Sequence, residues 1–296
     1  MFRGSFTALI TPFKKENPYE VDYEAFDKIL NFQISNGTHG LVPCGTTGES
    51  PTLTNQEHDQ VIEYCINKAS GRAKILAGTG SNNTQEAIER TQHAQKAGAD
   101  GALIMTPYYN KPTQEGIYRH FKEIHDNSDI DIIVYNIPGR SVIDITDETI
   151  ARMSSDLPRV VGIKDSSADL SRPKKLKSLL SGKSFDMLSG EDGTAVEFNQ
   201  EGGVGCISVT ANIFPKECAE MQEACLEGDF KKAERINNKI AKIHDLMFCE
   251  PSPQPVKYAA ELLGLCDGAL RLPLIEISAD NKDAIKAELQ KIGALS

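Results

Sequence analysis

Aromatic side chains are scarce in this 296-residue sequence: it has no tryptophan, and 6% of its residues are aromatic. Long apolar runs are also missing, since no stretch approaches the roughly eighteen apolar residues that indicate a membrane span. The first residues, MFRGSFTALITPF, contain no long apolar core followed by a small-residue cleavage site. The net charge is -10, with acidic and basic residues interspersed. A base-stacking surface, a nucleic-acid ligand and a membrane partner are therefore disfavoured, and we expect a cytoplasmic protein.

Paired cysteine motifs are absent as well. The seven cysteines are scattered and form no Cys-x-x-Cys pair, so neither a zinc site nor a disulfide framework is indicated. They are Cys44, Cys65, Cys206, Cys218, Cys225, Cys249 and Cys266. We expect reduced, buried thiols. The six histidines also lack ligand spacing, and no metal is expected.

The pattern that is present favours one α/β barrel. The length suits a barrel, and 40% hydrophobic and 25% charged residues are ordinary for a globular chain. Short apolar runs alternate with longer amphipathic stretches, as in repeated βα units. The runs are SFTALIT, GLVPC, AKILAG, GALIMT, DIIVYN, VVGIK, FDMLSG and GCISVT. Together they predict a (β/α)8 TIM barrel over residues 1–227, followed by a C-terminal helical segment over residues 228–296.

Helical periodicity and capping signals lie between these runs. Thr54 and Glu57 form a capping-box signature. Thr84 is expected to cap a helix that ends before Gly98. Other predicted helices cover residues 22–36, 116–126 and 171–180. After Asp229 the chain looks helical with one proline-rich break, and we expect that segment to pack against the barrel or a neighbouring subunit.

Lys164 closes an apolar strand, and strand ends carry the reactive groups of such barrels. Burying an unpaired ammonium is costly. Desolvation therefore favours the neutral amine, which can attack a ketone. The alternative interpretation is a structural ion pair, for example with Asp165, although strand alternation points that carboxylate away from Lys164. The residues alone leave both interpretations open.

Polar groups at other strand ends have two interpretations each. Tyr135 can exchange a proton beside Lys164, or it can bridge core and solvent. Arg140 offers a planar fork for a carboxylate, or it forms a surface salt bridge. The GTTGES loop (Gly45–Ser50) provides hydroxyls and N–H groups suited to a small carboxylate, but by itself it indicates a tight turn and lacks Walker spacing. The glycines of EGGVGCIS admit a ligand or mark a crowded strand entry.

Three motifs, GTTGES, YNIPGR and GIKDS, occur here in one order. On these motifs, and over nearly the whole chain up to the LRLP segment at 270–273, the sequence resembles the pyruvate-dependent aldolase family of dihydrodipicolinate synthase and N-acetylneuraminate lyase. The resemblance implies an imine between Lys164 and pyruvate, with no cofactor or metal. It also implies that Tyr135 donates and accepts protons, and that Thr46 links it to Tyr109 of an adjacent subunit. A shared relay implies a dimer as the smallest competent unit, and the family is usually a homotetramer built as a dimer of dimers.

The resemblance also implies substrate-binding positions. Thr47 and the Ile207 backbone would bind the pyruvate carboxylate and neighbouring atoms, with Gly190 among the substrate-binding residues. Arg140 would bind the carboxylate of the second substrate. GTTGE rather than GSTGE, and Arg140 directly after Ile-Pro-Gly, favour the branch whose aldehyde is L-aspartate 4-semialdehyde. The implied product is 4-hydroxy-tetrahydrodipicolinate, on the route to diaminopimelate and lysine.

Feedback by lysine is also implied. The positions that match the family's lysine-binding cleft at the dimer interface are Ser50, His58, Asn82, Glu86 and Tyr108. However, Pro51 and Asn55 stand where lysine-sensitive enzymes commonly have alanine and histidine, so inhibition by lysine stays open. Two other functions stay open: a pyruvate aldolase for a sugar or keto-deoxy acid, and a non-catalytic barrel that binds a small acid.

Overall fold

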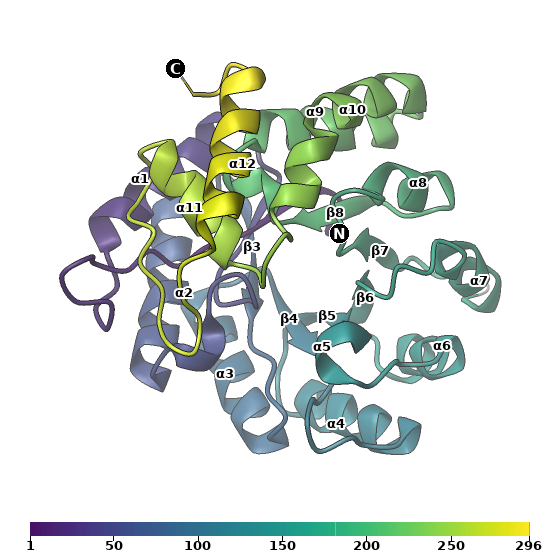
Figure 1. Cartoon of the computed structure of the whole chain (residues 1–296). Coiled ribbons are helices and arrows are strands. Elements are labelled where there is room, and N and C mark those ends of the chain that lie inside the picture. The colour runs from purple at the N-terminus through teal and green to yellow at the C-terminus, as the bar shows by residue number, and fades with distance from the viewer. Residues whose placement is uncertain (181, 296) are drawn as a thin grey trace.

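The computed structural model describes residues 1–180 and 182–295 of the chain. In these residues eight parallel strands close into a barrel in chain order, with helices around the outside (Figure 1). The strands are β1 (Gly4–Ala8), β2 (Gly40–Val42), β3 (Lys74–Gly78), β4 (Gly101–Met105), β5 (Asp131–Asn136), β6 (Val160–Asp165), β7 (Asp186–Ser189) and β8 (Gly205–Ser208). Each predicted apolar run overlaps one strand, and the predicted TIM barrel is confirmed.

The helices follow the strands along the chain. They are α1 (Tyr23–Ser35), α2 (Asn55–Ala69), α3 (Thr84–Ala97), α4 (Gln114–Asp126), α5 (Pro138–Ser141), α6 (Asp147–Asp156), α7 (Arg172–Leu179), α8 (Ala195–Gln200), α9 (Pro215–Leu226), α10 (Phe230–Leu246), α11 (Gln254–Leu262) and α12 (Ala279–Lys291), with short 3₁₀ helices η1 (Ser50–Thr52) and η2 (Thr210–Asn212). Across the described part of the chain, none of these helices is long and apolar enough to cross a membrane.

Helix caps confirm two sequence signals and correct a third. Thr54 and Glu57 form the predicted capping box at the start of α2. Gly98 ends α3 with φ of 97°, a left-handed conformation that glycine adopts without strain. Thr84 is not the N-cap: the side chain of Asn83 accepts the N–H of Gln85, because the residue just outside the helix faces the free N–H groups. The predicted helix at 116–126 begins earlier, at Gln114.

Two hydrophobic clusters surround the barrel and divide it into halves. One joins the outward faces of β2 and β3 to α1, α2 and the three C-terminal helices; we call this side the covered half. The other joins β4 to β7 with α4, α6 and α7; we call it the open half. A third cluster, which includes Phe6, Leu103, Ile133 and Leu188, fills the barrel interior, so the barrel is a packed core and not a pore.

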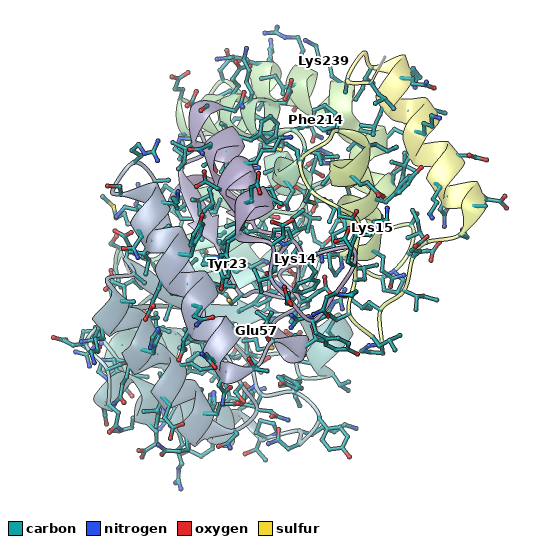
Figure 2. All side chains as sticks on the ribbon, turned by 90° about the vertical axis from the view of Figure 1, so that its left-hand side faces the viewer. Lys14, Lys15, Tyr23, Glu57, Phe214 and Lys239 are labelled. Carbon is teal, nitrogen blue, oxygen red and sulfur yellow. The ribbon has the colours of Figure 1, made fainter. Side chains whose placement is uncertain are left out.

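The C-terminal segment has the predicted helices α10, α11 and α12, with the proline-rich break between the first two. Residues 263–278, however, contain neither helix nor strand. Ile285 and Leu289 of α12 are buried in the same cluster as Leu30 of α1, so the segment shares its core with the covered half. Figure 2 views this side, with Glu57 at the start of α2 and Lys15 toward the C-terminal segment. The division after residue 227 stays a prediction.

Burial of the thiols was predicted for every cysteine and holds for five of the seven. Cys249 is exposed because it lies in the turn between α10 and α11, and Cys266 is partly buried. Burial raises the pKa of the Cys65 thiol well above its usual range. Among the described residues, no three His, Cys, Asp or Glu side chains are grouped so that they could hold a metal ion.

Candidate active site

Lys164 and Tyr135 lie side by side at the ends of adjacent strands. The register of β5 against β6 pairs the two residues directly, so both side chains point to the same side of the sheet. Lys164 is 6% exposed and Tyr135 5% exposed. The Lys164 Nζ lies 4.2 Å from the centroid of the Tyr135 ring. An amine and a phenol are therefore buried together within reach of one small molecule.

Asp165 is engaged away from Lys164, as strand alternation predicted. Its Oδ1 accepts a hydrogen bond from Asn136 Nδ2 at 2.8 Å and lies 3.5 Å from Arg172 Nε. The same Asn136 amide donates to Asp144, which also accepts from Arg172. This network, buried at Asn136, Asp165 and Arg172, connects the ends of β5 and β6, and an ion pair between Lys164 and Asp165 does not form. The sequence alone did not predict this network. A signal for it was present, because Asn136 and Asp165 directly follow Tyr135 and Lys164 on paired strands.

Gly190 leaves space beside the lysine at the end of β7. Its N–H donates to the Asp165 carbonyl at 2.7 Å, which places the backbone against β6. A Cβ atom at this position would lie 1.9 Å from Ser166 Oγ and 3.1 Å from Lys164 Cε. A side chain here would displace Ser166 Oγ and crowd the lysine, so glycine keeps the volume next to the amine free.

The GTTGES loop follows β2 and turns back on itself. The N–H of Gly48 donates to Gly45 O, and that of Glu49 donates to Thr46 O, both at 3.1 Å. Thr11, which follows β1, donates its hydroxyl to Gly48 O at 2.8 Å. Thr47 is buried. The loop is thus a compact turn at the end of the barrel where Lys164 and Tyr135 lie.

A cavity of about 350 Å³ connects several predicted positions. Thr46 and Arg140, from the predicted active site, line it together with Ser50, Glu86 and Tyr108 from the predicted lysine cleft. Arg140 is exposed and donates to the Ser252 carbonyl at 3.2 Å. The two predicted sites therefore border one hollow.

Two residues of the predicted lysine cleft lie apart from this lining. His58 is fully buried, with Nε2 2.9 Å from Gly78 O, and burial lowers the pKa of its imidazole to about 4. Asn82 donates to the Tyr108 carbonyl at 3.2 Å.

Glu86, which lines the cavity, is already paired with Arg90, at 2.9 Å. A ligand ammonium at Glu86 would therefore compete with that arginine.

Tyr109 and Ile207 occupy opposite environments. Tyr109 is 88% exposed and has φ of 69°, which is unfavourable for a bulky residue. Its ring therefore does not lie beside Lys164 within the protomer. Ile207 is buried in β8, in register with Phe6 of β1, so its backbone belongs to the barrel wall.

This arrangement defines the class of protein: a closed (β/α)8 barrel with a lysine amine and a tyrosine phenol buried side by side at its carboxyl end. The chain belongs to the dihydrodipicolinate synthetase family, whose pattern it matches over residues 1–292.

Relatives extend over the same length. The chain is 53% identical to the 4-hydroxy-tetrahydrodipicolinate synthase of Parvibaculum lavamentivorans, with 100% of both chains covered. It is also similar to the crystal structure of dihydrodipicolinate synthase from Aquifex aeolicus, with a TM-score of 0.95, 45% identity and 98% of each chain covered. The structure from Cyanidioschyzon merolae, solved with lysine bound, has a TM-score of 0.95 at 35% identity and covers 99% of both chains. The predicted family is confirmed.

Proposed function

We propose that this chain is a 4-hydroxy-tetrahydrodipicolinate synthase, a lyase that condenses pyruvate with L-aspartate 4-semialdehyde through a lysine Schiff base. The observation that carries the proposal is the buried Lys164 beside Tyr135 at paired strand ends. The name of the full-length bacterial relative supports the same reaction. The product feeds diaminopimelate and lysine biosynthesis in the cytoplasm.

Lys164 is the nucleophile in this proposal. Its neutral amine attacks the ketone carbon of pyruvate, and the carbinolamine loses water to form the imine. A methyl proton then leaves, and the resulting enamine adds to the aldehyde carbon. The substrate's own amine displaces Lys164 and closes the ring. The imine accepts the electrons of the departing C–H bond, so the reaction requires no separate cofactor.

Tyr135 transfers the protons, and its position over Lys164 supports that role. Thr46 links Tyr135 to Tyr109 of a neighbouring subunit. The exposure and unfavourable φ of Tyr109 support a contact outside the protomer, because such a conformation persists when its surroundings stabilise it. The dimer is then the smallest competent unit, within a homotetramer.

Substrate carboxylates are bound at two places in the proposed site. Thr47, the Ile207 backbone and the space beside Gly190 accommodate pyruvate. Arg140 binds the carboxylate of the aldehyde substrate, and its place as an exposed residue in the cavity lining supports this. A neutral sugar aldehyde has no carboxylate that this guanidinium could bind.

Lysine is the proposed inhibitor. Ser50, Glu86 and Tyr108 contact it in the cavity, while Asn82 donates to the Tyr108 carbonyl and the buried His58 contacts the Gly78 carbonyl. The lysine-bound relative supports this assignment. We expect the rate at subsaturating pyruvate to fall in millimolar lysine; a flat response would contradict the assignment.

Borohydride trapping tests the proposed reaction. Protein incubated with pyruvate and reduced should carry the adduct on the peptide that contains Lys164; no adduct, or one on another lysine, would refute it. Rates with L-aspartate 4-semialdehyde and with N-acetylmannosamine then identify the aldehyde. The Arg140→Ala variant should selectively lose activity with L-aspartate 4-semialdehyde.

A further inference from the structure

The GTTGES loop is fixed from outside the barrel by the C-terminal segment. Given the function proposed above, we propose that Lys257 and Arg271 are positioning residues for this loop and act through Glu49. The loop presents Thr46 and Thr47, the hydroxyls assigned to the proton relay and to the pyruvate carboxylate. Neither basic residue belongs to the barrel, and neither touches the amine of Lys164.

Glu49, the residue before the last of this loop, has a conformation that depends on its surroundings. Its φ of 53° is left-handed, which is unfavourable for a residue other than glycine. Both carboxylate oxygens face the C-terminal segment: Oε2 accepts the N–H of Arg271 at 3.1 Å, and Oε1 lies 2.5 Å from Lys257 Nζ. The N–H of Glu49 donates to Thr46 O at 3.1 Å, so Glu49 is bonded directly to the backbone of the threonine that we assign to the proton relay.

Lys257 reaches Glu49 from α11 through the protein interior. The side chains of both residues are 0% exposed. The contact is an ion pair without an aligned hydrogen bond to Oε1, while Lys257 Nζ donates to Ala269 O at 2.7 Å. Burial lowers the pKa of Lys257, and Glu49 opposes that shift. Each buried charge therefore depends on the other.

Arg271 secures the chain that follows Glu49. Its guanidinium donates to Thr52 O at 2.8 Å and to both carboxylate oxygens of Glu57, at 2.9 and 2.6 Å. This bidentate pair lowers the pKa of Glu57. The ring of Phe13 lies 4.0 Å from Lys257 Nζ and 4.1 Å from the Arg271 guanidinium carbon, which keeps the two cations together.

Stability alone does not require charges at this place. Apolar residues of similar volume often replace a buried ion pair with no loss of stability, because burying charge is itself unfavourable. A buried pair does, however, restrict its two residues to one relative position. The restricted element here is the loop that carries two substrate-site hydroxyls, so the pair has a consequence for binding that an apolar contact would not reproduce.

Lys257→Met tests the proposal, with Lys282→Met as the matched control. Both residues lie in the C-terminal segment and both pair with a glutamate, but the partner of Lys282 is Glu276, outside the loop. At a temperature where circular dichroism shows folded protein, Lys257→Met should raise the KM for pyruvate about tenfold and leave that for the aldehyde within about twofold. Lys282→Met should behave as wild type. A folded Lys257→Met with a normal pyruvate KM, or equal changes in both KM values, would overturn the proposal.

If Lys257→Met does not fold, the double variant Glu49→Gln/Lys257→Met removes both buried charges and keeps an oxygen for the Arg271 N–H. We expect it to fold with a raised pyruvate KM. Wild-type kinetics, or failure of this charge-free variant to fold, would make the pair merely structural. Borohydride trapping on wild-type protein is done first: an adduct at Lys164 supports the proposed reaction, so that a normal pyruvate KM in the variant counts against positioning alone.

Discussion

In the covered half of the barrel, Lys257 is fully buried against Glu49, and Arg271 is 3% exposed beside Glu57. In the open half, by contrast, Arg119 and Arg152 share Glu115 at the surface, with side chains 75% and 47% exposed. Charged pairs of the same chemistry thus serve different purposes. In the covered half these pairs fix a loop from inside the protein. The open half also has a buried pair, Arg172 with Asp165, but its Glu115 pairs remain in solvent, where pairing contributes little.

The halves also differ in how they present the proposed site residues. Thr46 and Thr47 come from a loop that buried charges fix from behind. Arg140 and Tyr109 come from loops of the open half, and both are exposed. Lys164 and Tyr135, at strand ends of the open half, are buried as well, so the exposed site residues of that half are the loop residues that we propose for the second substrate and for the subunit contact.

The largest effect should arise in the open half, at the end of β6. Lys164→Arg keeps a long cationic side chain, but a guanidinium does not form the imine, so kcat/KM should fall by at least about 10³-fold. Initial rates with both substrates measure this, and circular dichroism checks that the fold is intact. Activity within about tenfold of wild type would contradict the role of Lys164.

A comparison of unfolding free energies tests whether the buried Arg271 pair and the exposed Arg119 pair contribute differently to stability. Arg271→Ala leaves Glu57 without its arginine partner and the Thr52 and Pro18 carbonyls without this donor, and should reduce the free energy of unfolding by about 3–5 kcal/mol. Arg119→Ala, the exposed counterpart, should leave the urea midpoint almost unchanged. Equal shifts of the urea midpoint in the two variants would show that burial does not determine how much these two pairs stabilise the fold.

Tyr109 can be tested by mixing two impaired variants. Tyr109→Phe should lower kcat about 10²-fold, because the relay loses a proton-transferring hydroxyl. If Tyr109 acts in the neighbouring subunit, a dissociated and reassociated mixture with Lys164→Arg contains dimers with one intact site. Random pairing should then restore about a quarter of wild-type activity. No recovery, with heterodimers confirmed by mass spectrometry, would place Tyr109 in its own subunit's site.

The smallest effect concerns acid stability and is expected in both halves. His58 and His120 are buried, and burial lowers the pKa of each to about 4. Below the ordinary histidine pKa the unfolded chain binds protons that the folded chain does not, so stability is present above about pH 6.5 and is lost as the pH falls toward 4. Each histidine should contribute about 1 kcal/mol of loss between pH 6 and 5.

Urea titrations at several pH values measure this loss. The variant His58→Gln retains a donor for Gly78 O and should have a shallower slope, whereas an unchanged slope would show that His58 does not titrate on unfolding.

Particular residues show how far sequence reasoning extends. The eight strands were predictable because strands buried on both faces are continuous apolar runs. The meeting of Tyr135 and Lys164 was predictable because consecutive strands pair in a barrel. The N-cap of α3 was not predictable: the residue types of Thr84 and Asn83 both suit an N-cap, and only the backbone conformation distinguishes them. Cys249 was expected to be buried because of its residue type, yet a turn exposes it.

The amino-acid sequence by itself determined the barrel, its family and the lysine at the end of β6, because local hydrophobic pattern and motif order specify these features. Only the tertiary structure decided how Glu49 in the GTTGES loop meets Lys257 and Arg271 near the other end of the chain. No local sequence pattern predicts such a contact, because residues far apart in the sequence form an ion pair only where the fold brings their side chains together. The same reason explains why the C-terminal segment, predicted only to pack against the barrel or a neighbouring subunit, contacts the GTTGES loop of the proposed pyruvate site.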